Sequence, residues 1–276
     1  MKPAPFEYAR PATVAEAADL LADDSVETKL LAGGQSLVPL MNFRLARPER
    51  LVDLNGVDEL RALSVEDDEL RIGAMVRTAE LERSAAARDH WGLLADAVRH
   101  IGHFQVRNRG TVGGTVAHAD PTAELPIALR ALNATVRIRS RAGERVASVA
   151  DLAVGPMMTS LESDEIVAEI RVPAPRGLRG RGFEEFARRP GDFALAAVAC
   201  VVTDQETRFV VGGVTPCPRD VRVDGHVDAS AVRGLLSRDL ESLEGRSDVH
   251  ADGAYRKRLA IELGVRAHAR ATEGGA

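Results

Sequence analysis

The sequence has 276 residues, of which 45% are hydrophobic and 28% are charged, with a net charge of −5 and a pI near 5.9. This composition is typical of a soluble globular protein in two or three lobes, and its acidic balance gives no electrostatic footprint for nucleic acid. The longest apolar run, residues 193–202, is about half the length of a membrane-spanning helix. Because the N-terminus also lacks the apolar segment of a secretory signal, we expect a cytoplasmic protein without a membrane span.

Cysteine and histidine usage excludes two kinds of metal site. The chain has two cysteines, Cys200 in an apolar run and Cys217 in a Pro-Cys-Pro loop. An iron–sulfur cluster generally takes four cysteine ligands, so this chain cannot hold one by itself. His100 and His103 form an HxxH pair, but no third ligand follows at a suitable spacing, and we predict no bound metal.

The first elements read as a βαβ unit. Residues 11–22 have the spacing of an amphipathic helix, and residues 28–32 read as a short buried strand that ends at the two glycines 33–34. Ser36 stands where a helix N-cap belongs, and a further strand is predicted at residues 51–54. Such a turn suits a phosphate or pyrophosphate, although an ordinary strand-to-helix turn with a serine cap would show the same pattern.

A second glycine-rich stretch follows. Residues 60–101 predict a hairpin and then helices that lead to a loop containing Gly110, Gly113 and Gly114, after which a helix is expected over residues 121–132. Glycine lets a ligand approach the main chain where a Cβ would block it. The glycines do not form the GxGxxG fingerprint of a Rossmann fold, so a bound dinucleotide would require another fold.

The remaining elements are assigned by periodicity and turn residues. They are strands at residues 134–139, 144–149 and 165–172, a lobe boundary at residues 173–182, strands at residues 183–188, 194–203 and 208–214, and helices at residues 229–243 and 254–271.

Four blocks of sequence carry a resemblance to a known family. They are AGGQSLVPLMNFRLARPERLVDL at residues 32–54, IGHFQVRNRGTVGGTVAHADPTAELP at 101–126, RPGDFALAAVA at 189–199 and AYRKRLA at 254–260. In this order they resemble the FAD-binding medium subunit of the molybdenum-containing hydroxylases, the family of carbon monoxide dehydrogenase and xanthine dehydrogenase.

The resemblance implies an α+β fold. Residues 1–176 would form an FAD-binding domain of the PCMH or vanillyl-alcohol-oxidase type, in two α/β lobes of about residues 1–56 and 57–176. Residues 177–276 would form a smaller C-terminal α+β domain.

The resemblance also assigns residues to FAD. In the family the two glycine stretches grip the FAD pyrophosphate, the first of them largely through backbone N–H groups. Carried over by position, the assigned residues are Ala32, Gly33, Gly34, Gln35, Ser36 and Leu37 in the first stretch, and Thr111, Gly113, Gly114 and Thr115 in the second.

Three further residues have competing interpretations. Asp120 and Glu124 match acidic positions that contact the ribityl or adenosine portion of FAD in relatives, but Asp120 is also a suitable N-cap before Pro121, and Glu124 could be a helix-face carboxylate. Phe193 aligns where some relatives carry a Tyr near the isoalloxazine, or else it is a core residue at the start of a buried strand.

The implied activity is that of an FAD-dependent oxidoreductase subunit without catalytic side chains of its own. Electrons would reach FAD from [2Fe-2S] clusters of a small partner subunit and leave to NAD, oxygen or a quinone, while a molybdopterin-containing large subunit oxidises the substrate. Two alternatives remain open at this point: a stand-alone flavoenzyme that acts on its own small substrate, and a non-redox nucleotide-binding or assembly module.

Overall fold

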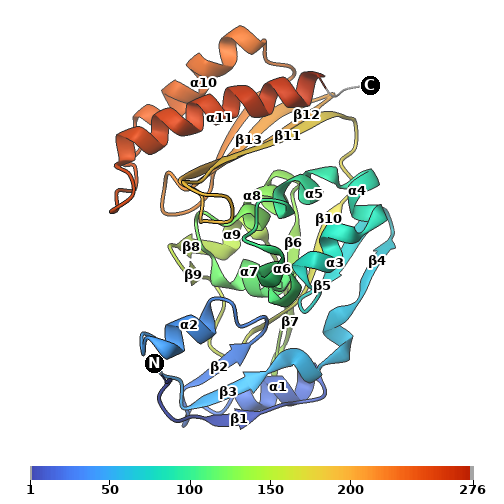
Figure 1. Cartoon of the computed structure of the whole chain (residues 1–276). Coiled ribbons are helices and arrows are strands. Elements are labelled where there is room, and N and C mark those ends of the chain that lie inside the picture. The colour runs from blue at the N-terminus through green and yellow to red at the C-terminus, as the bar shows by residue number, and fades with distance from the viewer. Residues whose placement is uncertain (1, 274–276) are drawn as a thin grey trace.

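The computed structural model describes residues 2–273. Within that range the chain forms a three-stranded, a five-stranded and a four-stranded sheet, and a two-stranded ribbon. Figure 1 shows these sheets following one another from the N-terminal lobe at the bottom to the C-terminal helices at the top.

The N-terminal sheet is parallel, in the order β1-β3-β2. Its lobe comprises β1 (Glu7–Ala9), α1 (Val14–Leu21), β2 (Thr28–Leu31), α2 (Leu37–Asn42), β3 (Arg50–Asp53) and the 3-10 helices η1 (Leu54–Gly56) and η2 (Asp58–Arg61). The predicted βαβ unit is confirmed. Helix α1 begins where the Thr13 hydroxyl accepts a hydrogen bond from the Glu16 N–H, and its buried face packs with β3 and with Ile166 and Ala168 of the central sheet.

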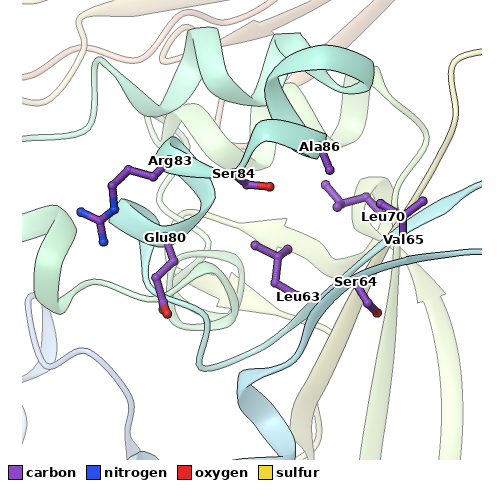
Figure 2. Close-up of a pocket in the computed structure, with 8 residues that line it drawn as sticks. All are labelled: Leu63, Ser64, Val65, Leu70, Glu80, Arg83, Ser84 and Ala86. Atoms are coloured by element: carbon purple, nitrogen blue, oxygen red, sulfur yellow. The ribbon is translucent and has the colours of Figure 1, made fainter.

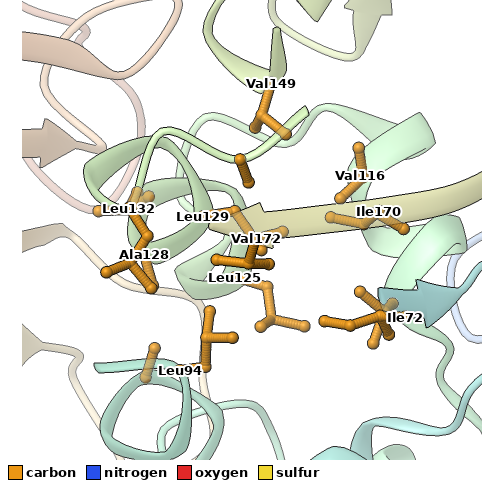
Figure 3. Packing of buried hydrophobic residues seen from close by; sticks show 14 of the residues in the cluster. Ile72, Leu94, Val116, Leu125, Ala128, Leu129, Leu132, Val149, Ile170 and Val172 are labelled. Atoms are coloured by element: carbon orange, nitrogen blue, oxygen red, sulfur yellow. The ribbon is translucent and has the colours of Figure 1, made fainter. Parts of the chain in front are cut away.

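The central sheet is antiparallel, in the order β4-β5-β10-β6-β7. Its lobe comprises β4 (Leu63–Glu66), β5 (Glu69–Gly73), α3 (Thr78–Arg83), α4 (Ala85–His90), α5 (Gly92–Val98), α6 (Phe104–Arg109), α7 (Val112–His118), α8 (Glu124–Ala131), β6 (Thr135–Ser140), β7 (Gly143–Ser148), α9 (Val149–Leu152), β8 (Ala153–Gly155), β9 (Met158–Thr159) and β10 (Ile166–Pro173). Figure 3 shows how Leu125 and Leu129 of α8 lie over Ile170 and Val172 of β10. Each such fully buried side chain contributes about 1.5–3 kcal/mol.

The C-terminal sheet is antiparallel and covered on both faces. Its lobe comprises β11 (Leu178–Phe186), β12 (Ala196–Thr203), β13 (Glu206–Gly212), β14 (Arg219–Asp224), α10 (Ala229–Glu241) and α11 (Gly253–Glu273). Along β12, Val198 and Cys200 face α10 and α11, whereas Ala199 and Val201 face the core around α8. This double burial explains why the strand reads as a continuous apolar run.

The expected α+β fold is confirmed, and several elements differ in detail. The helix expected over residues 121–132 begins at Glu124, because the Asp120 carboxylate accepts from the Thr122 N–H and the Pro121 carbonyl accepts from the Gly213 N–H at 2.8 Å. The second glycine loop is instead the start of α7. Strand β14 was not predicted, because charged residues alternate along it as on an exposed surface. The domain boundaries at residues 56 and 176 remain predictions.

Candidate functional site

The fold brings the two glycine stretches into contact. A Cβ added to Gly33 would lie 2.4 Å from the Arg109 carbonyl oxygen and 2.8 Å from the Gly110 Cα, and one added to Gly114 would lie 3.2 Å from the Ala32 Cβ. The approach at Gly33 is between two backbone segments, and a side chain there would prevent it. The glycines therefore set the spacing between the β2–α2 turn and the start of α7.

The β2–α2 turn has hydrogen-bond donors that its own fold does not use. Gly34 has a φ of +75°, a conformation that favours glycine, and the Ser36 side chain makes no capping bond to α2. Within residues 2–273, no acceptor is recorded for the successive backbone N–H groups of Gly33, Gly34, Gln35, Ser36 and Leu37. Backbone donors in a turn of this kind suit an anion with several oxygen atoms.

The second stretch differs, because its donors are already used. Gly113 donates to the Ala74 carbonyl at 2.9 Å, and Gly114 and Thr115 donate to the side chain and the carbonyl of Thr111 at 3.1 and 3.0 Å. A Cβ on Gly113 would lie 2.4 Å from the Ala74 Cβ. Gly113 thus serves close packing of α7 on the end of β5. The two threonine hydroxyls are also engaged within the segment, since the buried Thr111 hydroxyl accepts from Gly114 and the Thr115 hydroxyl donates to the Thr111 carbonyl at 3.0 Å.

Positive charge gathers where the two stretches meet. The pKa of Arg77 is lowered by burial and by the nearby guanidinium groups of Arg109 and Arg61. Arg77 donates to neutral oxygens of Asn55 and Arg109, and among the described residues neither Arg77 nor Arg109 has a carboxylate partner. Unused donors and guanidinium groups without a direct carboxylate partner together fit the diphosphate of a dinucleotide cofactor.

Asp120 and Glu124 lie on either side of the α8 N-terminus. Asp120 is half-buried and caps its own turn through Thr122 rather than the helix, so its interpretation as a helix N-cap is wrong. Glu124, the first residue of α8, is only 8% exposed, which excludes a solvated helix-face carboxylate.

Glu124 faces Glu185 of β11. Burial, reinforced by the Asp120 carboxylate, raises the pKa of Glu124 to about 7, and burial together with Glu124 raises the pKa of Glu185 to about 9. The His100 Nδ1 lies 4.0 Å from a Glu185 carboxyl oxygen, and burial lowers the pKa of this histidine. The pair therefore retains a proton at neutral pH, shared across the contact between the central and C-terminal lobes.

Phe193 lies in the connection from β11 to β12 and is 76% exposed. Its interpretation as a core residue is therefore wrong. The ring is available to cover a ligand, and its placement beside the isoalloxazine stays a prediction.

Two surface hollows lie away from the glycine stretches. One groove, of about 330 Å³, is shown in Figure 2 and runs between the β4–β5 hairpin and α3 and α4. A cleft of about 500 Å³ lies between this hairpin and the C-terminal sheet. Neither is lined by a residue of the two glycine stretches. Residues 2–273 contain no group of three or more His, Cys, Asp or Glu side chains placed to hold a metal ion, and none of their helices has the length and apolar character to cross a bilayer.

Three residues of this region were missed at the level of sequence. Asn55 and Arg77 connect the glycine stretches, and Glu185 completes the buried acid pair. Each of these residues lies in a segment whose sequence is typical of a common helix, strand or turn. No sequence motif connects any of them to the glycine stretches.

Comparison with known proteins identifies the family. Residues 4–175 match the family described as the FAD binding domain in molybdopterin dehydrogenase. The chain is 40% identical over 274 residues to the nicotine 6-hydroxylase medium subunit of Paenarthrobacter nicotinovorans, covering 95% of this chain and 96% of the relative. It is 34% identical over 278 residues to the carbon monoxide dehydrogenase medium chain of Hydrogenophaga pseudoflava, covering 97% of each.

A solved structure shows the same likeness in three dimensions. A carbon monoxide dehydrogenase from Hydrogenophaga pseudoflava, which lacks the Mo-pyranopterin moiety of its molybdenum cofactor, matches with a TM-score of 0.94 and 34% identity over 100% of both chains. Because the likeness extends from one end of the chain to the other in both sequence and fold, the chain belongs to the family of FAD-binding medium subunits of molybdenum-containing hydroxylases.

Proposed function

We propose that this oxidoreductase chain is the subunit through which electrons pass from [2Fe-2S] clusters of a small partner subunit to an external acceptor, with NAD, oxygen and a quinone as the candidates. A molybdopterin-containing large subunit would oxidise the substrate. The complex would act in the cytoplasm, with residues 1–176 as the FAD-binding domain and residues 177–276 as the C-terminal domain.

The observation that carries the proposal is the cysteine inventory of a chain that belongs to an FAD-binding family. Cys200 is buried in β12, Cys217 lies in a loop, and no other cysteine is present. Any iron–sulfur cluster of the complex would therefore lie in another chain. Two relatives support this division, since they are named as a medium subunit and a medium chain.

When bound, FAD supplies the one- and two-electron redox chemistry. In our proposal the protein holds its diphosphate through the unused N–H groups of the β2–α2 turn, namely those of Gly33, Gly34, Gln35, Ser36 and Leu37, with Ala32 at the start of the turn. Thr111 and Thr115 would face the same group from the start of α7, where Gly113 and Gly114 permit the close approach.

The remaining proposed contacts concern the rest of the cofactor. The carboxyl groups of Asp120 and Glu124 would contact its ribityl or adenosine portion, and Phe193 would shield one face of the isoalloxazine from water. Because burial raises the pKa of Glu124 to about 7, its carboxyl group would be protonated in part of the molecules at neutral pH and could then donate a hydrogen bond.

Purification of the tagged full-length chain from cells that also produce its partners tests this proposal. We expect one FAD for each copy of this chain, with iron and acid-labile sulfide in a separate copurifying chain. A complete, active preparation without an iron–sulfur chain, in which an organic substrate reduces the flavin directly, would contradict it and would favour the stand-alone flavoenzyme.

A further inference from the structure

One side chain connects the segments that form the glycine junction. Arg77 lies between β5 and α3, and its guanidinium donates to the Asn55 side-chain oxygen and to the Arg109 carbonyl. Asn55 follows β3 of the N-terminal lobe, whereas Arg109 ends α6 of the central lobe. Arg77 therefore ties the two lobes of the FAD-binding domain at the point where the glycine stretches meet.

Asn55 carries this contact to the first glycine stretch. Its amide nitrogen donates to the Ala32 carbonyl at 3.0 Å and to the Asp53 carboxylate at 2.5 Å. Although burial alone would raise it, hydrogen bonds from Tyr8 and Asn55 hold the pKa of Asp53 below its usual value, so the acceptor is charged. Because a guanidinium only donates and a carboxylate only accepts, one orientation of the Asn55 amide satisfies all its neighbours.

The two carbonyl acceptors that Arg77 and Asn55 hold both lie next to Gly33. The Ala32 carbonyl directly precedes this glycine, and the Arg109 carbonyl oxygen lies 2.4 Å from the position of a Gly33 Cβ. A shift of either carbonyl would move the unused N–H groups that begin at Gly33. The position of these donors thus depends on the two bonds that a single guanidinium makes.

We propose that Arg77, acting through Asn55, is the positioning residue that fixes the β2–α2 turn against α7 and thereby sets the affinity for the diphosphate half of the cofactor. This inference rests on the proposed placement of FAD at the glycine junction. The shape of the Arg77 side chain matters more than its charge, because its planar guanidinium donates to the Asn55 and Arg109 oxygens at the same time. A lysine would keep the charge and lose the planar group.

Titration of the FAD-free, full-length chain with ADP and with FAD tests the inference. The variants are Arg77→Met, Arg77→Lys, Asn55→Ala and the double variant Arg77→Met/Asn55→Ala. Arg61→Met is the matched control, because Arg61 belongs to the same cluster but contacts Asn55 only at its backbone carbonyl, at 2.8 Å. Thermal melting of each FAD-free variant is followed in parallel, so that a loss of fold is separated from a loss of affinity.

We expect Arg77→Met and Asn55→Ala each to weaken ADP binding by roughly 10- to 100-fold. The double variant should lose no more than either single variant, because both changes break one chain of contacts. Arg77→Lys should resemble Arg77→Met, and Arg61→Met should lose less than about fivefold. The variants should remain folded at the titration temperature, with the melting temperature lowered by only a few degrees for the lost hydrogen bonds.

Unaltered ADP binding by Arg77→Met would overturn the inference. So would wild-type affinity in Arg77→Lys, since charge alone would then be sufficient, or additive losses in the double variant. If the unaltered chain binds neither ADP nor FAD at the glycine junction, the proposed site itself fails and the inference fails with it. Normal binding by the unaltered chain together with normal binding by Arg77→Met overturns only the inference.

Discussion

The buried Glu124–Glu185 pair is the most consequential feature at the scale of single residues. The Glu185 side chain is 5% exposed, and one of its carboxyl oxygens has no hydrogen-bond partner among the described residues. Both pKa values are raised, to about 7 and about 9. The folded state therefore holds protons that the unfolded chain releases near pH 4.5. The pair contributes stability at acidic pH that is lost as the pH rises through about 7 and then about 9.

Glu185→Gln should flatten this dependence. The amide cannot ionise. At pH 9 the free energy of unfolding of the variant should therefore be about 1–3 kcal/mol higher than that of the unaltered chain, and near pH 5 the two values should be nearly equal. Chemical denaturation of the FAD-free chain at several pH values measures the effect.

Glu184→Gln is a suitable control, because the preceding residue on β11 pairs with Arg270 of α11 instead. It should leave the alkaline loss of stability in place. An equal alkaline loss in the unaltered chain and in Glu185→Gln would show that this pair does not hold the proton.

At the scale of elements, α7 shows that a glycine-rich motif can lie in a helix although its composition predicts a loop. The glycines 113 and 114 were read as a loop, yet they lie in the first turn of a helix whose N-cap is Thr111. Glycine has low helix propensity. What overrides it is tertiary packing, since α7 can approach β5 only without a Cβ at Gly113.

Gly113→Ala and Gly114→Ala should therefore have different effects. The first places a methyl group 2.4 Å from the Ala74 Cβ and should destabilise the chain by about 1–3 kcal/mol. The second meets the Thr111 hydroxyl and the Ala32 Cβ, at 2.7 and 3.2 Å. It should weaken FAD binding more than stability, because the gain in helix propensity offsets part of the strain.

Melting temperature and FAD affinity, measured on the same two variants, check this division of roles. If Gly114→Ala binds FAD normally, or if Gly113→Ala is as stable as the unaltered chain, the packing argument is wrong.

The sequence predicted an element well where the local pattern of apolar residues or glycines determines the structure. The period of the apolar residues located α1 and α11, a continuous apolar run located β12, and the fold brings the two predicted glycine stretches into contact. Prediction failed where a contact between residues far apart in the sequence determines the local structure. The start of α8 depends on a hydrogen bond from Gly213 to Pro121, and the Arg77 guanidinium is held by Asn55 and by the Arg109 carbonyl. None of these partners can be identified from one sequence.

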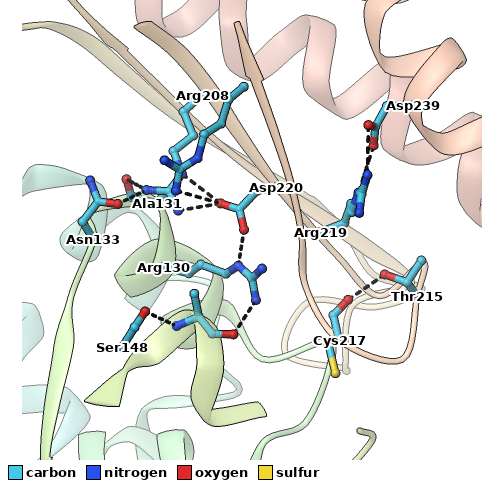
Figure 4. Close-up of polar contacts among 12 residues, drawn as sticks. Arg130, Ala131, Asn133, Ser148, Arg208, Thr215, Cys217, Arg219, Asp220 and Asp239 are labelled. Carbon is cyan, nitrogen blue, oxygen red and sulfur yellow. Dashed lines mark hydrogen bonds and ion pairs between the residues drawn. The ribbon is translucent and has the colours of Figure 1, made fainter. Parts of the chain in front are cut away.

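At the scale of the whole molecule, a buried charge network joins the C-terminal sheet to α8. Figure 4 shows Asp220 of β14 between Arg208 and Arg130, while Arg208 also donates to the Ala131 carbonyl and the Asn133 side chain. The Arg208 side chain is 2% exposed. Although burial would raise it, the two guanidinium groups hold the pKa of Asp220 below its usual value. The network therefore stabilises the contact above that pKa, and its contribution is lost as the pH falls through it.

Asp220→Asn should destabilise the chain by about 3–5 kcal/mol near pH 7, because it leaves a buried guanidinium without its counter-charge. Asp239→Asn breaks the more exposed Arg219–Asp239 pair in the same lobe, whose atoms lie 3.2 Å apart, and should cost about 0–1 kcal/mol. Denaturant unfolding at pH 7 compares the two. Equal losses would mean that the Asp220 network adds no more than an ordinary surface ion pair.

The central claim is that electrons leave the iron–sulfur clusters through the FAD of this chain. The most direct test uses the purified complex, once with FAD and once after its removal, reduced anaerobically with dithionite and then mixed with NAD, oxygen or a quinone while cluster absorbance is followed. We predict fast re-oxidation by the physiological acceptor only when FAD is present, with recovery when FAD is added back. Equally fast re-oxidation of the FAD-free complex by all three acceptors would contradict the account.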